Sequence, residues 1–133
     1  MALTQDRNTQ MQDGELIAVP VAATKKIFAG SLVAANSSGY ATPGAVATTL
    51  TYLGRAEEQV DNTTGANGDK TVNVRRGKAF KFKNHGADLV TQAELGKTCY
   101  IVDDETVAKT NGTSARSAAG KVVGIDSDGV WVE

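Results

Sequence analysis

Hydrophobic and polar residues alternate most clearly in the middle of the chain. The run TVNVR at 71–75 places its two valines on one face, and the run FKFK at 80–83 alternates in the same way. Side chains of a β-strand point to opposite faces in turn, so this period of two predicts strands. Because Gly77 lies between the two runs, we expect them to form a β-hairpin.

Shorter hydrophobic runs follow along the rest of the chain, between clusters of Gly, Asn, Asp and Ser that predict turns. Pro20 cannot donate to a strand ladder and favours a sheet edge, and Gly54 interrupts its run as a β-bulge would. Only 87–95, before Gly96, could form a short helix. We expect the remaining strands over 15–21, 26–35, 40–41, 46–60, 98–102, 106–108, and a terminal hairpin of 121–125 with 130–132.

This pattern predicts a mostly β protein. Many short strands with frequent turns favour a compact β-sandwich or barrel of short antiparallel strands, with at most one short helix. The length of 133 residues suits one domain, which we place at 15–133. Residues 1–14 are polar and show no helical or strand period, so we expect an extended N-terminal arm. Such a segment is either a frayed terminus or an arm that orders on a partner.

Charge and targeting signals exclude several function classes. The formal net charge is −1, and the only basic stretch, Arg75-Arg76 with Lys78, Lys81 and Lys83, is typical of a solvated strand face. We therefore expect no nucleic-acid partner. The sequence has no apolar run of membrane-spanning length and no signal-peptide pattern, so we also expect no membrane partner and synthesis in a reducing cytoplasm.

The residues that carry chemistry in other proteins are scarce here. His85 and Cys99 are each the only residue of their type, and nothing in the sequence places them together. Two acidic clusters, 103–105 and 126–128, match turns and lack calcium-loop spacing. Trp131 is either a core residue or, less commonly, an interface residue. We expect no catalytic residue, no metal site and no cofactor.

Several segments, in their order along the chain, resemble the small decoration (cement) proteins of tailed-bacteriophage heads. An aliphatic–Ala–Gly–x–hydrophobic–Val pattern followed by Gly and an aromatic residue is similar to the opening of that family. The central and closing parts are also similar. The segments are Lys26–Val33, Gly39–Ala41, Leu53–Glu58, Asp61–Gly68, Val72–Gly77, Phe80–Phe82, Ala119–Asp126 and Gly129–Val132.

The resemblance implies a structural virion protein that carries out no catalysis. It would bind the outer capsid surface after synthesis in the bacterial host cytoplasm, as a homo-oligomer, with a trimer favoured over a dimer. Its partner would be the major capsid protein, whose subunits it would bridge. An extended arm can add a strand to a neighbour's sheet. The expected partner-binding residues are Leu3, Thr4, Gln5, Asp6, Arg7, Asn8, Thr9, Gln10 and Met11 in the arm, and Asn62, Thr63, Thr64 and Asn67 in the loop 61–69.

Two other classes remain open at this stage. One is another phage structural or carbohydrate-binding β module, such as a tail-tube or tail-spike component, although seven aromatic residues are few for a sugar platform. The other is an enzyme, whose mark would be activity that depends on His85 or Cys99.

Overall fold

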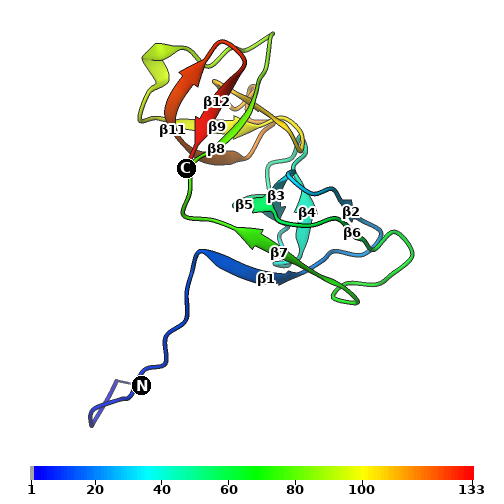
Figure 1. Ribbon diagram of the computed structural model, residues 1–133, viewed down its shortest axis with the longest axis vertical. Coiled ribbons are helices and arrows are strands. Elements are labelled where there is room, and N and C mark those ends of the chain that lie inside the picture. The colour runs from blue at the N-terminus through cyan, green and yellow to red at the C-terminus, as the bar shows by residue number, and fades with distance from the viewer. Residues whose placement is uncertain (1) are drawn as a thin grey trace.

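The computed structural model describes residues 2–133 and shows two β lobes with an extended segment at the N-terminus (Figure 1). We call the part built from β1–β7 the sheet lobe and the part built from β8–β12 the barrel lobe. The prediction of a mostly β protein with an extended arm is confirmed. Of the predicted arm, Met1 lies outside the described residues.

The sheet lobe is a five-stranded antiparallel sheet with a small two-stranded sheet beside it. The order across the larger sheet is β1 (Leu16–Pro20), β7 (Thr71–Arg75), β5 (Thr51–Ala56), β3 (Leu32–Ala35) and β4 (Ala41–Pro43), and the smaller sheet pairs β2 (Lys26–Ile27) with β6 (Val60–Asp61). Pro20 lies in edge strand β1, as the sequence predicted.

The predicted bulge at Gly54 is also present. The register between β3 and β5 shifts there, so that Val33 faces Gly54 and Ala34 faces Tyr52. Gly54 has φ +151°, and a Cβ atom at this position would overlap the carbonyl oxygen of Arg75. Only glycine lets β5 approach β7 this closely.

The barrel lobe is a closed five-stranded barrel in the order β10-β8-β12-β11-β9. All its strand pairs are antiparallel except β10 with β8, which is parallel and departs from the expected antiparallel arrangement. The strands are β8 (Phe80–Asn84), β9 (Thr98–Ile101), β10 (Thr106–Ala108), β11 (Ala118–Asp126) and β12 (Gly129–Val132). The terminal hairpin of β11 and β12 is confirmed.

Each lobe has its own hydrophobic core, and strand β3 contributes to both. Val33 packs in the core of the sheet lobe, whereas Leu32 and Ala34 pack in the core of the barrel lobe. Alternate residues of a strand point to opposite faces, so β3 is buried on both sides and holds the lobes together. The largest fully buried side chains include Ile27, Val72 and Val74 in the first core and Ile101, Val107, Val122 and Val130 in the second.

The predicted hairpin between 71–75 and 80–83 is wrong. Strand β7 pairs with β1 and β5, whereas β8 pairs with β10 and β12, so the two runs belong to different lobes. The chain crosses between the lobes at 76–79, where Gly77 has φ +74°. Alternation identified the buried faces of both strands correctly, but an alternating pattern does not specify the partner strand.

The helix expected over 87–95 is reduced to a 3₁₀ turn, η1 (Gln92–Glu94). The Asn84 side chain explains this, because its amide donates to the Val90 carbonyl and its oxygen accepts from the Val90 N–H, both at 2.8 Å. This pairing holds the preceding backbone away from helical geometry. The strand expected over 46–60 is also shorter, since β5 begins at Thr51.

Candidate partner-binding site

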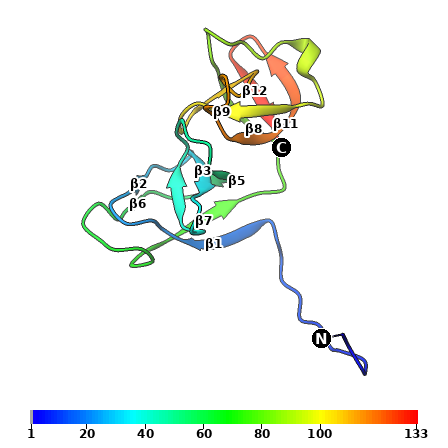
Figure 2. The same cartoon turned by 180° about the vertical axis from the view of Figure 1, so that it is seen from behind.

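No hydrogen bond joins residues 2–14 of the arm to a strand of either lobe, and the Asp13 carboxylate accepts only from the nearby Glu15 N–H, at 3.0 Å. Figures 1 and 2 show the arm leading away from the body of the molecule. Its hydrogen bonds are local: the Thr9 N–H donates to the Arg7 carbonyl, and the Arg7 Nε donates to the Thr9 hydroxyl, both at 3.1 Å. Leu3 is 72% exposed and Met11 is 98% exposed. All the arm residues named as candidates are therefore accessible: Leu3, Thr4, Gln5, Asp6, Arg7, Asn8, Thr9, Gln10 and Met11.

The arm leads directly into β1, whose outer edge pairs with no other strand in residues 2–133. On its inner edge, the Arg76 N–H donates to the Glu15 carbonyl, and the Val21 N–H donates to the Lys70 carbonyl, both at 2.8 Å. Backbone groups of an antiparallel strand alternate between its two sides. Ile17 and Val19 therefore also turn their backbone groups toward β7.

By the same alternation, Leu16, Ala18 and Pro20 turn their backbone groups outward. The open edge thus offers the N–H and carbonyl groups of Leu16 and Ala18, and Pro20 has no N–H to leave unpaired. The open stretch ends just after β1, because Val21 forms a parallel bridge with Ala41 of the opposite edge strand β4, and the Ala22 N–H donates to the Ala41 carbonyl at 2.9 Å. An exposed row of unpaired backbone groups is a template for pairing with another chain.

The loop 61–69 is held together by its own asparagines. Asn62 is buried, and its amide donates to the carbonyls of Ala22 and Ala66, both at 3.0 Å. The side-chain oxygen of Asn67 accepts from the Ala23 N–H at 2.7 Å. These two candidate residues shape the loop, and Asn62 does not face solvent. The sequence marked them as turn residues but gave no sign that one is buried.

Thr63, Thr64 and Asn67 are the candidate residues that remain exposed at this loop. The Thr63 hydroxyl and N–H both bond the Asp61 carboxylate, at 2.7 and 3.0 Å, and these bonds, with the hydroxyl first, lower the pKa of Asp61. The loop therefore presents a short, rigid threonine tip next to the smaller sheet of the sheet lobe.

The basic stretch carries mostly paired charges. Arg75 bonds Glu57 at 2.7 Å, Lys78 bonds Glu15 at 3.3 Å, and Lys83 bonds Glu105 at 2.6 Å. Lys81 lies 3.0 Å from Asp128. These acidic partners neutralise most of the positive charges of the basic stretch. The pairing agrees with the prediction that the stretch forms a solvated strand face.

Cys99 and the acidic turn 103–105, which the sequence offered as candidates for chemistry, have environments that disfavour a reactive role. Cys99 is buried in the barrel core, and burial raises the pKa of its thiol to about 12, so the reactive thiolate is disfavoured. In the acidic turn 103–105, the Asp103 carboxylate accepts from the Glu105 N–H at 2.9 Å. Within residues 2–133, no group of three or more His, Cys, Asp or Glu could hold a metal ion.

Trp131 is not a core residue. Val130 and Val132 are fully buried, so the side chain between them points out of the barrel and is 36% exposed. Its Nε1 donates to the Asp126 carboxylate at 2.8 Å, and Lys81 Nζ lies 5.6 Å from its ring centroid. The alternation of Trp131 with the two valines could have predicted this orientation from the sequence.

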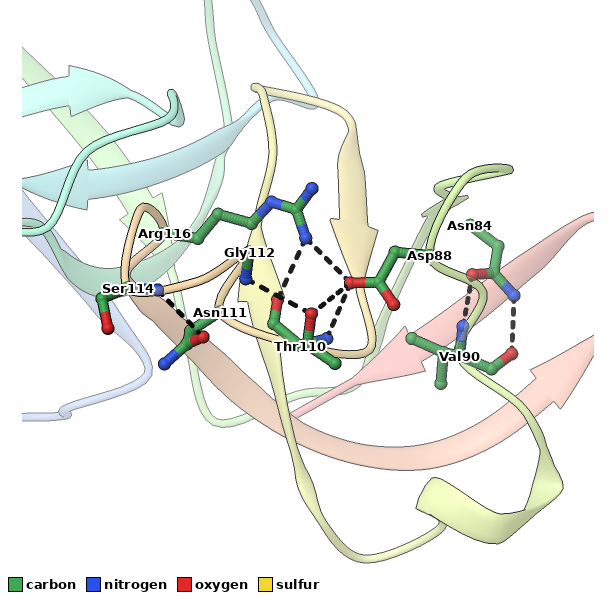
Figure 3. A network of polar contacts seen from close by, with 8 residues as sticks. All are labelled: Asn84, Asp88, Val90, Thr110, Asn111, Gly112, Ser114 and Arg116. Carbon is green, nitrogen blue, oxygen red and sulfur yellow. Dashed lines mark hydrogen bonds and ion pairs between the residues drawn. The ribbon is translucent and has the colours of Figure 1, made fainter.

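One polar network was missed at the sequence level (Figure 3). The Asp88 carboxylate accepts from the N–H and hydroxyl of Thr110 and from Arg116 Nη1, the last at 2.9 Å. These bonds join the loop after β8 to the loop between β10 and β11. The network holds two barrel loops together, and its three residues are too far apart in sequence to form a local motif.

No protein-family model, curated protein or solved structure matches this chain. Within residues 2–133 there is also no helix long and apolar enough to span a membrane. The open edge of β1 and the exposed arm before it have unpaired backbone groups, which can pair with an extended segment of another chain.

Proposed function

We propose that this protein is a bacteriophage capsid decoration protein that binds the outer surface of the head and bridges major capsid subunits. The observation that carries the proposal is the continuity between the arm and the open edge of β1. Together they offer a long stretch of backbone for pairing with an extended segment of another protein. The sequence resemblance to decoration proteins supplies the identity of that partner.

The physical chemistry of such binding suits this molecule. A protein that binds only the assembled lattice stabilises it by mass action. Several weak contacts, repeated in a homo-oligomer, add by avidity, which is why we favour a trimer or dimer on the capsid surface. Strand addition gives affinity through main-chain hydrogen bonds and needs no enzymatic chemistry. The protein would be made in the bacterial cytoplasm and act on the virion.

Co-sedimentation with undecorated, expanded heads tests the proposal. Wild-type protein is expected to pellet with the heads and to saturate. A variant in which residues 3–11 are replaced by Gly and Ser at the same length should fold normally and lose most of this binding, because the segment is exposed and its hydrogen bonds lie within the arm. A double variant outside the candidate binding residues, Thr48→Ala with Thr49→Ala in the exposed loop between β4 and β5, is the matched surface control. If wild-type protein does not pellet with the heads, the proposal fails.

A further inference from the structure

A hollow of about 370 Å³ opens at the junction of the two lobes. The turn between β2 and β3 supplies Phe28, Ala29, Gly30 and Ser31, and the turn between β9 and β10 supplies Asp104 and Glu105. The two turns are fixed to each other, since the Leu32 N–H donates to the Asp104 carbonyl at 2.7 Å. The walls of the hollow are therefore preorganised.

Ser31, in the wall of the hollow, carries a buried hydroxyl without a hydrogen-bond partner. Ser31 is only 6% exposed, and its Oγ makes no hydrogen bond. A buried polar group without a partner has a desolvation cost, which a bound hydrogen-bonding group would offset.

The hollow also contains a carboxylate without a counter-ion. Asp104 is half-buried and takes part in no ion pair within residues 2–133, whereas its neighbour Glu105 pairs with Lys83. Burial, followed by the charges of Asp103 and Glu105, raises the pKa of Asp104. A cation placed beside Asp104 would be bound favourably.

The third wall is aromatic. Phe28 is 53% exposed, and Lys26 Nζ already lies 5.1 Å from its ring centroid. An exposed ring next to a carboxylate and a hydroxyl suits the flat guanidinium of arginine, which stacks on aromatic faces while donating several hydrogen bonds.

We propose that this hollow binds an arginine side chain of the protein surface on which the molecule sits. Asp104 would accept from the guanidinium, the Ser31 hydroxyl would gain a partner, and Phe28 would cover one side. Only the identity of the partner, a capsid subunit, rests on the proposed function. The chemistry of the hollow can be tested without it.

The direct test is an NMR titration of the ¹⁵N-labelled full chain with N-acetyl-arginine amide. N-acetyl-citrulline amide, which has the same shape without the charge, is the control probe. We expect saturable shifts of the amide signals at Ser31 and Asp104 with the arginine probe only. Asp104→Asn should weaken binding about tenfold, as expected for the loss of a charge-assisted contact, and Ser31→Ala should weaken it less. Asp103→Asn, one residue away, should have a smaller effect than Asp104→Asn.

The proposal would be overturned if the arginine probe gave no saturable shift, or if the citrulline probe gave equal shifts. It would also be overturned if calcium chloride shifted the signals of Ser31 and Asp104 and the arginine probe did not. Spectra of the free variants show whether each one folds, and the Ser31→Ala result stands if Asp104→Asn does not fold. In head sedimentation, Asp104→Asn should weaken binding about tenfold. Equal binding by that variant would exclude the hollow from the capsid contact. If wild-type protein does not bind heads at all, the proposed function fails, and the titration still decides whether the hollow binds arginine.

Discussion

The two lobes differ in whether the edges of their sheets are paired. The barrel lobe closes on itself, so its five strands have no free edge. The sheet lobe remains open at β1, where outward-facing backbone groups lie next to an arm whose hydrogen bonds join only nearby residues. Both lobes bury a hydrophobic core, so burial alone does not distinguish them. Edge closure does distinguish them, because only the sheet lobe has unpaired strand edges of the kind that can pair with another chain.

The largest expected effect tests whether the two cores are one folding unit. Ile27→Ala removes a buried side chain from the sheet core, and Ile101→Ala removes one from the barrel core. Each should lower the free energy of unfolding by about 2–5 kcal/mol. Because β3 is buried in both cores, we expect each variant to unfold in a single transition.

Denaturant unfolding followed by far-UV circular dichroism and by Trp131 fluorescence measures both points. Trp131 reports on the barrel lobe alone. If Ile27→Ala shifts the circular dichroism transition but leaves the fluorescence transition in place, the lobes unfold separately.

The next prediction tests the two sides of β1. Ile17→Pro removes an N–H that faces β7 and should destabilise the protein by about 3 kcal/mol. Ala18→Pro removes an outward-facing N–H, so it should cost less stability but weaken binding to heads. Chemical denaturation and co-sedimentation measure the two effects, with Ile17→Ala separating the loss of the side chain from the loss of the N–H. Equal destabilisation by both prolines would show that the assigned sides are wrong.

A smaller effect is expected at the loop 61–69. Asn62→Ala leaves the carbonyls of Ala22 and Ala66 without their donor and should cost about 1–3 kcal/mol. Thr64→Ala, at an exposed position in the same loop, should change stability little. Thermal unfolding of the two variants compares them, and similar melting temperatures would show that the asparagine does not hold the loop.

The smallest prediction concerns acid stability. The Thr110 hydroxyl, ahead of the Thr110 N–H and Arg116, lowers the pKa of Asp88 against the opposing effect of burial. A carboxylate with a lowered folded-state pKa contributes stability above its unfolded pKa of about 3.9, and this is lost as the pH falls through the folded value. Wild-type protein should therefore lose more stability than Asp88→Asn between about pH 5 and 2. Denaturant midpoints across this range measure the difference, and Asp6→Asn in the arm is the control. Parallel pH profiles for wild type and Asp88→Asn would contradict the prediction.

The sequence predicted local features well and long-range pairing poorly. The edge position of Pro20, the bulge at Gly54 and the terminal hairpin each depend on properties of a few neighbouring residues. The choice of partner strand for β7 does not depend on neighbouring residues, because the alternating pattern of β7 is the same whichever strand it pairs with. The Asp88–Arg116 contact joins distant loops and left no local pattern.

The candidate binding residues divide in the same way. The arm was visible because 1–14 is polar without any period, and the residues from Leu3 to Met11 are indeed exposed. The burial of Asn62 was not visible, because an asparagine in a turn has the same sequence signature whether it faces solvent or the interior. The open edge of β1 could be assigned only after the strand order was known.

The double burial of β3 has a consequence for synthesis on the ribosome. The strands of the sheet lobe all emerge before β8, yet Leu32 and Ala34 pack against residues that include Val130 and Val132. One face of the early sheet therefore stays uncovered until the last strand of the barrel has been made. The nascent sheet lobe would carry a transient apolar surface during translation, at the stage when a growing chain is most prone to aggregate.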